Sequence, residues 1–207
     1  MIHLECDNDE ALMLALGKPI RQISHHAGKG RVSKGLSTSS RAADIGLIDQ
    51  DPGQPPPPYL RQYKIVEQSA QLGLVLSKHP TEGKHLIEIQ PDLEPWLYRI
   101  GPAVGIKPTD HRLPEKPSGL HQEAKKHRQH LIDYLQACVK ANSPHLAKLA
   151  EWLRLARVVE VFARIAGAGR AGDQPVPVGQ AGQQFAGGGG VLGDQQGVGH
   201  GGAPSGL

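Results

Sequence analysis

Acidic residues follow two apolar segments of this chain at the points where those segments end. Asp49 directly follows the apolar run at residues 45–48, and Asp51 comes two residues after Asp49. Glu5 follows the apolar start of the chain, and Asp9 comes four residues later. Like-charged carboxylates are costly to keep ionised together unless a positive charge lies between them. Carboxylate oxygens suit a hard cation, so the pattern predicts a Mg²⁺ site that Mn²⁺ could also occupy.

The segments around these acids alternate between strand and helix patterns. In chain order the predicted elements are a strand at 1–4, a helix from Asp7 to Leu16, a strand at 22–26, a helix within 28–40 and a strand at 45–48. Crossovers of this length join parallel strands and place helices on both faces of the sheet. The order predicts an α/β fold with a mostly parallel sheet, in which the strand ends bring the acids to one edge.

The next part of the chain predicts a hairpin followed by helices. After the proline run at 55–58, apolar strands at 72–77 and 85–90 flank a segment rich in turn residues. The predicted helices that follow span residues 92–100, 120–139 and 143–165, the first and last of them capped by Asp92 and Ser143.

Composition divides the 207 residues into three parts. Residues 1–155 carry the predicted α/β domain with its C-terminal helices, and residues 156–165 extend the last helix. Residues 166–207 hold no lysine, are rich in glycine and show no periodicity, so they predict a disordered low-complexity tail. The abrupt change is also consistent with a frame shift or a misassigned end of the coding region.

Charge and cysteine usage predict a soluble, cytoplasmic protein. The net charge of +3 tolerates a polyanionic partner without requiring one. Cys6 and Cys138 form no metal-finger or CxxC pattern, which favours a reduced chain. The N-terminus lacks a signal-peptide pattern, and no window approaches about 18 consecutive apolar residues, so no membrane association is expected.

Three short segments resemble motifs of a known family. The segments LECDNDEAL (4–12) and GLIDQDPG (46–53) resemble the glutamate and DxD motifs of the Toprim domain of topoisomerases, primases and OLD-type nucleases. The segment DLEPWLYRI (92–100) is similar to the F-E-x-W-L segment of small stand-alone Toprim proteins of the RloB-like kind. The resemblance covers about residues 1–155 and implies a Toprim-like, Rossmann-like sheet.

The resemblance also implies a role for each matched residue. Glu5 would act as the acid/base or metal-facing glutamate, Asp49 and Asp51 as the metal aspartates, Asp9 as an auxiliary acid, and Glu94 with Trp96 as the third motif. Three residues depart from the family pattern. Cys6 replaces the usual glycine, Leu93 replaces phenylalanine, and Pro95 separates Glu94 from Trp96.

A structural interpretation of the same acids stays open. Asp7, Asp9 and Glu94 would favour helix N-termini without binding a metal. Asp49 and Asp51 would form the turn before Pro52. Trp96 suits the core better than a site, and the pair His25–His26 suits a structural or exposed position.

The leading functional hypothesis is a Mg²⁺-dependent protein that acts on nucleic-acid phosphodiesters, as a nuclease in defence or repair. Lys29, Arg31 and Lys34 precede the acidic strand and could hold the nucleic-acid backbone. The alternative is a non-catalytic module that binds a nucleotide, a nucleic acid or a protein through the same fold, so whether the chain is an enzyme stays open. Nucleotide-sugar transfer through the DxD motif ranks last. The oligomeric state is not predicted.

Overall fold

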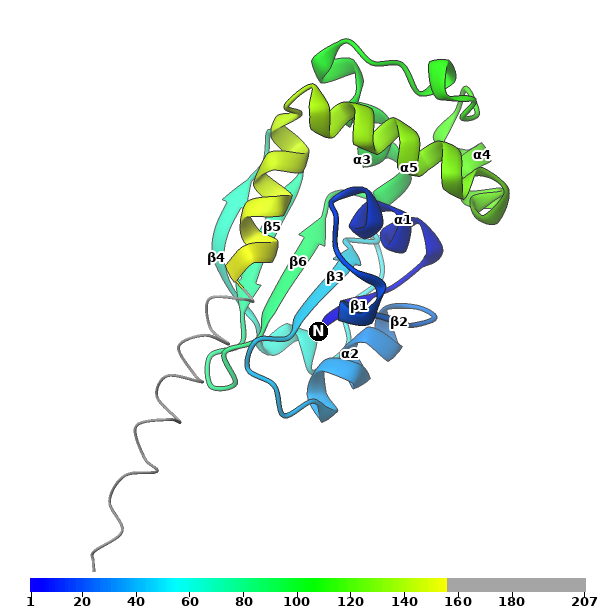
Figure 1. The fold of residues 1–207 in the computed structure, drawn as a ribbon. Coiled ribbons are helices and arrows are strands. Elements are labelled where there is room, and N and C mark those ends of the chain that lie inside the picture. Colours follow the sequence, from blue (N-terminus) through cyan, green and yellow to red (C-terminus); the bar gives the residue numbers. More distant parts are fainter. Residues whose placement is uncertain (156–207) are drawn as a thin grey trace, which may run out of the picture. The chain divides into compact units, whose positions relative to one another are not determined.

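The computed structural model of the protein describes residues 1–155, which form a six-stranded mixed sheet in the order β2-β1-β3-β6-β5-β4 (Figure 1). The strands are β1 (Ile2–Leu4), β2 (Ile23–His25), β3 (Ile45–Asp49), β4 (Lys64–Ser69), β5 (Leu74–Lys78) and β6 (His85–Ile89). The neighbours β2, β1, β3 and β6 run parallel, whereas β5 and β4 add an antiparallel extension beyond β6. The fold is therefore α/β with a mostly parallel sheet.

The register of the central strands places the acids at one edge. Leu4 at the end of β1 pairs with Leu47 of β3, and Asp49 at the end of β3 pairs with Ile89 of β6. Glu5 follows β1 directly, so it leaves the sheet at the same edge as Asp49. This edge is the carboxyl end of the parallel strands, where ligands bind in open α/β sheets.

The helices join and follow these strands. Their bounds are α1 (Asp7–Ala15), α2 (Lys29–Thr38), α3 (Leu93–Ile100), α4 (Pro117–Gln122) and α5 (Ala124–Lys140), and residues 144–155 are also helical. Short 3-10 turns lie at Ile20–Gln22, Leu60–Gln62, Pro102–Val104 and Pro108–His111. None of the helices within residues 1–155 combines the length and the apolar character that crossing a membrane requires.

Most of the helices pack on one face of the sheet. Apolar residues of α1, α3, α4, α5 and residues 144–155 form a single core with the inward residues of β1, β3, β5 and β6. Trp96, Tyr134 and Trp152 are its largest fully buried side chains. The apolar residues are spaced along α3 and α5 as an amphipathic helix requires, so the burial of this stripe fixes both helices on the sheet.

The opposite face carries α2 and a smaller core. Val32 and Leu36 of α2 pack against Ile48 and Leu86 of the sheet. Gly46 of β3 makes this close packing possible, because a Cβ there would lie 2.8 Å from a Leu36 methyl carbon. Leu60 and Tyr63, which come after the proline run, complete this core.

The prediction of alternating strands and helices is confirmed for residues 1–49, and so are the hairpin strands β5 and β6. Two predictions were incomplete. The predicted helix at 120–139 is two helices, because the backbone at Glu123 (φ −124°, ψ 35°) leaves helical geometry between α4 and α5. The strand β4 was not predicted, because its residues are almost all exposed and carry no one-sided apolar pattern. Predictions for 156–165 and 166–207 lie outside the described residues.

Candidate acidic site at the carboxyl ends of the strands

Glu5 lies between the end of β1 and the start of α2. Its Oε1 accepts a hydrogen bond of 2.9 Å from the backbone amide of Lys29, the first residue of α2. Its own backbone carbonyl accepts a hydrogen bond from the amide of Gly28. Gly28 has φ +92°, a left-handed value that glycine adopts without a Cβ penalty, and this turn aims the α2 N-terminus at Glu5. The positive end of α2 therefore faces the carboxylate.

Asp9 supports the turn that carries Glu5. Its Oδ2 accepts hydrogen bonds of 3.0 Å from the backbone amides of Glu5 and Cys6, as the third residue of a capping box does at a helix start. This contact confirms a structural role for one oxygen of Asp9. The side chain is completely buried, and its other oxygen, Oδ1, has no hydrogen-bond partner.

Three carboxylates at this edge share the same unusual state. Among the described residues, Glu5 Oε2, Asp9 Oδ1 and Asp49 Oδ1 are buried oxygens without a hydrogen-bond partner. Buried polar atoms are nearly always paired, because an unpaired one costs about 1–3 kcal/mol. Three such oxygens, carried by the residue after β1, by α1 and by β3, suit either shared protons or a bound cation.

The pKa values of these carboxylates show that they interact. Burial raises the pKa of Asp49 to about 7, and the negative charge of Glu5 adds to the effect. Burial also raises the pKa of Asp9 well above its usual value, and the charge of Asp49 is the next cause. For Glu5, burial raises the pKa although the nearby Lys29 ammonium opposes the shift. The sheet therefore brings Glu5, Asp9 and Asp49 within electrostatic reach of one another.

Asp51 belongs to the same edge but has a partner. Its Oδ2 lies 2.9 Å from the Lys29 Nζ, which also donates a hydrogen bond of 3.1 Å to the backbone carbonyl of Gln50. Asp51 has φ +49°, a left-handed conformation that aspartate tolerates better than most residues. Lys29 thus contacts Glu5 through its backbone and Asp51 through its side chain.

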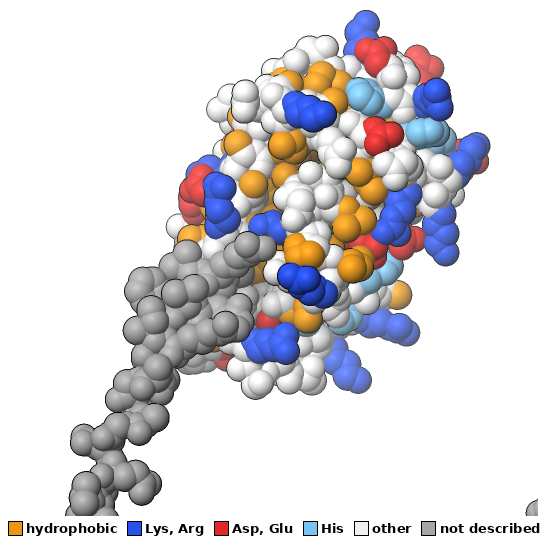
Figure 2. All heavy atoms as spheres, viewed as in Figure 1, with side chains coloured by type: hydrophobic (Ala, Val, Ile, Leu, Met, Phe, Trp, Pro, Cys, Tyr) orange, Lys and Arg blue, Asp and Glu red, His pale blue; other side chains and the backbone are white. Residues whose placement is uncertain are grey.

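The other two basic residues singled out in the sequence, Arg31 and Lys34, are exposed on α2. Their role in binding nucleic acid stays a prediction. On the face shown in Figure 2, Lys and Arg side chains are interspersed with acidic ones and do not form one continuous basic patch. Among the described residues, some basic side chains are paired with acids, as in Lys126–Glu123 and Arg128–Glu10.

Glu94 lies beside the acidic cluster and is held by two side chains. Its Oε1 accepts a hydrogen bond of 3.0 Å from Asn8 Nδ2 and lies 3.0 Å from His121 Nδ1. Its charge contributes to the raised pKa of Asp49. Trp96 is completely buried and donates its Nε1 hydrogen to the Leu72 carbonyl, so its prediction as a core residue is confirmed.

Sequence reasoning missed Asn8 and His121. Asn8 is the neighbour of Asp9 on α1, and its type and position in the first turn of a helix are a weak signal for a polar contact. His121 is 27 residues beyond Glu94 and lies on α4, so no local pattern joins the two.

The cluster does not form a ready-made cage for a metal. Within residues 1–155, no group of three or more His, Cys, Asp or Glu side chains is arranged so that it could hold a metal ion directly. Mg²⁺ is commonly bound through one or two carboxylates and keeps several of its waters. The unpaired oxygens of Glu5, Asp9 and Asp49 fit that mode of binding better than a complete protein cage.

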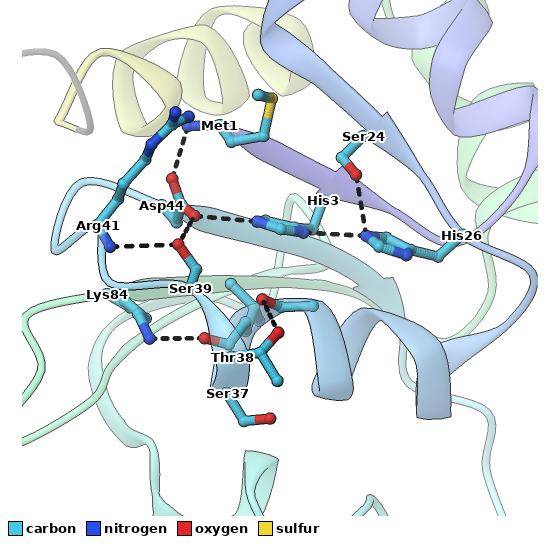
Figure 3. A network of polar contacts seen from close by, with 12 residues as sticks. Met1, His3, Ser24, His26, Ser37, Thr38, Ser39, Arg41, Asp44 and Lys84 are labelled. Atoms are coloured by element: carbon cyan, nitrogen blue, oxygen red, sulfur yellow. Dashed lines mark hydrogen bonds and ion pairs between the residues drawn. The ribbon is translucent and has the colours of Figure 1, made fainter. Parts of the chain in front are cut away.

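A second polar cluster surrounds Asp44, which precedes β3 at its opposite end, and this cluster packs against α2 (Figure 3). Asp44 accepts hydrogen bonds from the N-terminal ammonium of Met1 at 2.7 Å and from Ser39 Oγ at 2.5 Å. His3 Nε2 lies 3.1 Å from Asp44, and its Nδ1 lies 2.9 Å from His26 Nε2. This contact agrees with the structural position expected for His26.

Comparison with protein-family models, with curated proteins and with solved structures gives no match for this chain.

Proposed function

We propose that this chain is a Mg²⁺-dependent protein that cleaves nucleic-acid phosphodiesters at the carboxyl edge of its sheet. The observation that carries the proposal is the set of three buried, unpaired carboxylate oxygens on Glu5, Asp9 and Asp49. Buried acids with raised pKa values at a strand edge are typical of functional sites, because folding alone gains nothing from leaving them unpaired. The resemblance of the surrounding segments to Toprim motifs supports the same proposal.

The residues divide the chemistry between them. Asp49 and Asp51 would hold the ion together with waters, and Asp9 would act as an auxiliary acid beside them. When bound, a divalent ion would neutralise charge on a phosphodiester oxygen and orient a water for attack. Glu5 would accept the proton of that water, and its raised pKa and the absence of a hydrogen-bond donor to its Oε2 support this role.

Lys29 would contact the phosphate of the substrate as well as Asp51 of the site. Its ammonium neutralises Asp51 when no substrate is present. A phosphate that approached the N-terminus of α2 would meet the same ammonium and the positive end of the helix. Part of the affinity for nucleic acid would then depend on salt, since each phosphate contact releases counterions.

Cleavage assays on the full chain test this proposal. Plasmid DNA and single-stranded RNA are incubated with the protein in Mg²⁺, in Mn²⁺ and in EDTA. We expect cleavage only with metal, and its loss to the metal-free level in Asp49→Asn/Asp51→Asn. The matched control is Asp133→Asn, which removes an exposed carboxylate on α5 outside the cluster. Intact substrates under every condition would refute the nuclease proposal.

One observation favours a second candidate, a non-catalytic module that binds nucleotide, nucleic acid or protein. The Lys29–Asp51 ion pair already neutralises one of the two DxD carboxylates. A site that never binds metal could keep this pair as a purely structural contact. Calorimetric titration of Mg²⁺ into the wild type and Asp49→Asn/Asp51→Asn separates the two candidates. Equal, negligible heats from both proteins favour the non-catalytic module.

A further inference from the structure

An exposed histidine is held at the margin of the acidic cluster by a buried carboxylate. The side chain of His121 on α4 is 76% exposed, yet its Nδ1 lies 3.0 Å from Oε1 of Glu94. The Glu94 side chain is 12% exposed and is fixed by the second hydrogen bond, from Asn8 Nδ2. One ring nitrogen of His121 is thus committed to the protein, which leaves Nε2 as the nitrogen available to solvent or to a ligand.

The residues that hold His121 also support the acidic cluster. Asn8 is the neighbour of Asp9 on α1, and Glu94 follows Leu93, whose backbone amide hydrogen-bonds to Asp49. Both supports of the histidine are therefore chain neighbours of groups that build the cluster. The charge of Glu94 also reaches Asp49, which places the His121–Glu94 pair beside the carboxylates and not on a remote surface.

The proposed reaction needs a proton donor for the leaving oxygen, and His121 could be that donor. Carboxylates such as Glu5 can accept the proton of an attacking water, but the oxygen that leaves phosphorus must gain a proton. The Lys29 ammonium is held between Asp51 and the Gln50 carbonyl. His25 lies at the same edge, but its Nδ1 is 3.8 Å from Asp7, beyond hydrogen-bond distance.

We propose that His121 is the proton donor to the leaving oxygen, and that Glu94 is the positioning residue that holds it. This inference rests on the proposed phosphodiester cleavage. In the step, a lone pair of the water oxygen forms the new bond to phosphorus, and the water proton passes to Glu5. The ester P–O bond breaks, its electron pair stays on the leaving oxygen, and that oxygen takes the Nε2 proton of the His121 imidazolium.

A change of leaving group separates this role from a structural one. The substrates are a matched pair of oligonucleotides with one cleavable linkage, in which the bridging leaving oxygen is either kept or replaced by sulfur. A thiolate leaves without protonation, so it makes a proton donor unnecessary. The variants are His121→Gln, Glu94→Gln and the matched control His25→Gln, which removes an exposed imidazole near a carboxylate at the same edge.

We expect His121→Gln to lower kcat on the oxygen substrate by about 100-fold or more, within the usual range for a general acid. The same variant should cleave the sulfur substrate at nearly the wild-type rate. Glu94→Gln should show a smaller loss of the same kind, and His25→Gln should match the wild type on both substrates. An equal loss for His121→Gln on both substrates, or no loss on the oxygen substrate, would overturn the role of His121.

The failure of the proposed function gives a different result. A wild-type protein that cleaves neither substrate overturns both proposals, whereas normal cleavage by His121→Gln overturns only this one. Long-range ¹H–¹⁵N spectra of the histidine rings in the metal-free protein add a measurement that does not depend on activity. We expect the neutral ring of His121 to carry its proton on Nδ1, and Glu94→Ala to remove that preference. A wild-type ring protonated on Nε2 would contradict the proposed positioning by Glu94.

Discussion

The two ends of β3 carry aspartates in opposite electrostatic states. Asp44 precedes the strand and is 1% exposed, but hydrogen bonds from His3, the N-terminus and Ser39 outweigh its burial and hold its pKa well below the usual value. Asp49 ends the strand, and burial with the charge of Glu5 raises its pKa to about 7. Hydrogen-bond donors thus satisfy the carboxylate of Asp44, whereas Asp49 keeps one oxygen, Oδ1, without a partner. The aspartate at the amino end is fully engaged within the fold, whereas the carboxyl end keeps unpaired carboxylate oxygens, which the proposed function assigns to a ligand.

The largest expected effect concerns the paired aspartate. In Asp44→Ala, His3 and the Met1 ammonium lose their shared carboxylate, and we expect unfolding to become easier by about 3 kcal/mol, as when one partner of a buried ion pair is removed. Chemical denaturation at pH 7 measures the change. Asp49→Asn is the matched variant at the other end of β3, and it should not lose stability. Equal losses in the two variants would contradict the contrast between the strand ends.

A smaller effect is expected from metal binding at the other end. Mg²⁺ at 100 times its Kd should stabilise the wild type by about 2.7 kcal/mol, because a ligand that binds only the folded state shifts the equilibrium toward it. The melting temperature with Mg²⁺ and with EDTA provides the measurement. The shift should vanish in Asp49→Asn/Asp51→Asn and persist in Asp133→Asn. A shift that survives in the double variant would place the ion elsewhere.

The third expected effect is a dependence on pH with opposite signs at the two ends. The folded-state pKa of Asp49 is raised from 3.8 to about 7. Between about pH 4 and 7 this carboxyl is therefore ionised in the unfolded chain but still protonated in the folded one. The metal-free protein loses stability as the pH rises through this range. Asp49→Asn should therefore be more stable than the wild type at pH 7, with little difference at pH 4.

Asp44 behaves in the opposite way, because its folded-state pKa is lowered. Its contribution is present above the unfolded pKa near 4 and is lost as the pH falls through the folded value. Denaturation of the wild type, Asp49→Asn and Asp44→Asn from pH 3 to 8 tests both signs. A stability gain of Asp49→Asn that stayed constant over this range would show that Asp49 is not titrating there.

Sequence reasoning placed Glu5 and Asp49 at one edge because it needed only the order of strands and helices. The strand β1 and the strand β3 are short and apolar, and the crossovers between them have room for a helix, which leaves one parallel arrangement. The individual partners of the acids were not predictable in this way. The pairing of Lys29 with Asp51 depends on the left-handed turn at Asp51, and a single sequence does not reveal that turn.

Long-range contacts between side chains also could not be predicted from the sequence. The contact of His121 with Glu94 requires α4 to fold back after a loop that contains two 3-10 turns. The network of His3 with Asp44 joins residues 41 positions apart, and Gly35 allows α2 to approach it, because a Cβ there would lie 2.8 Å from His3 Nδ1. Such contacts follow from tertiary packing, which periodicity does not encode.

The antiparallel strand β4 is an edge strand of the sheet, and its irregular pairing affects whether a strand of a second copy of the protein could pair with it. The ladder between β4 and β5 shifts register between Ile65 and Glu67, which bends the outer strand. Glu67 is further engaged by Lys148 and Trp152 of the last described helix. A bent strand with an anchored charge is a poor template for adding a further strand, so the exposed Ile65 does not offer a flat surface for aggregation.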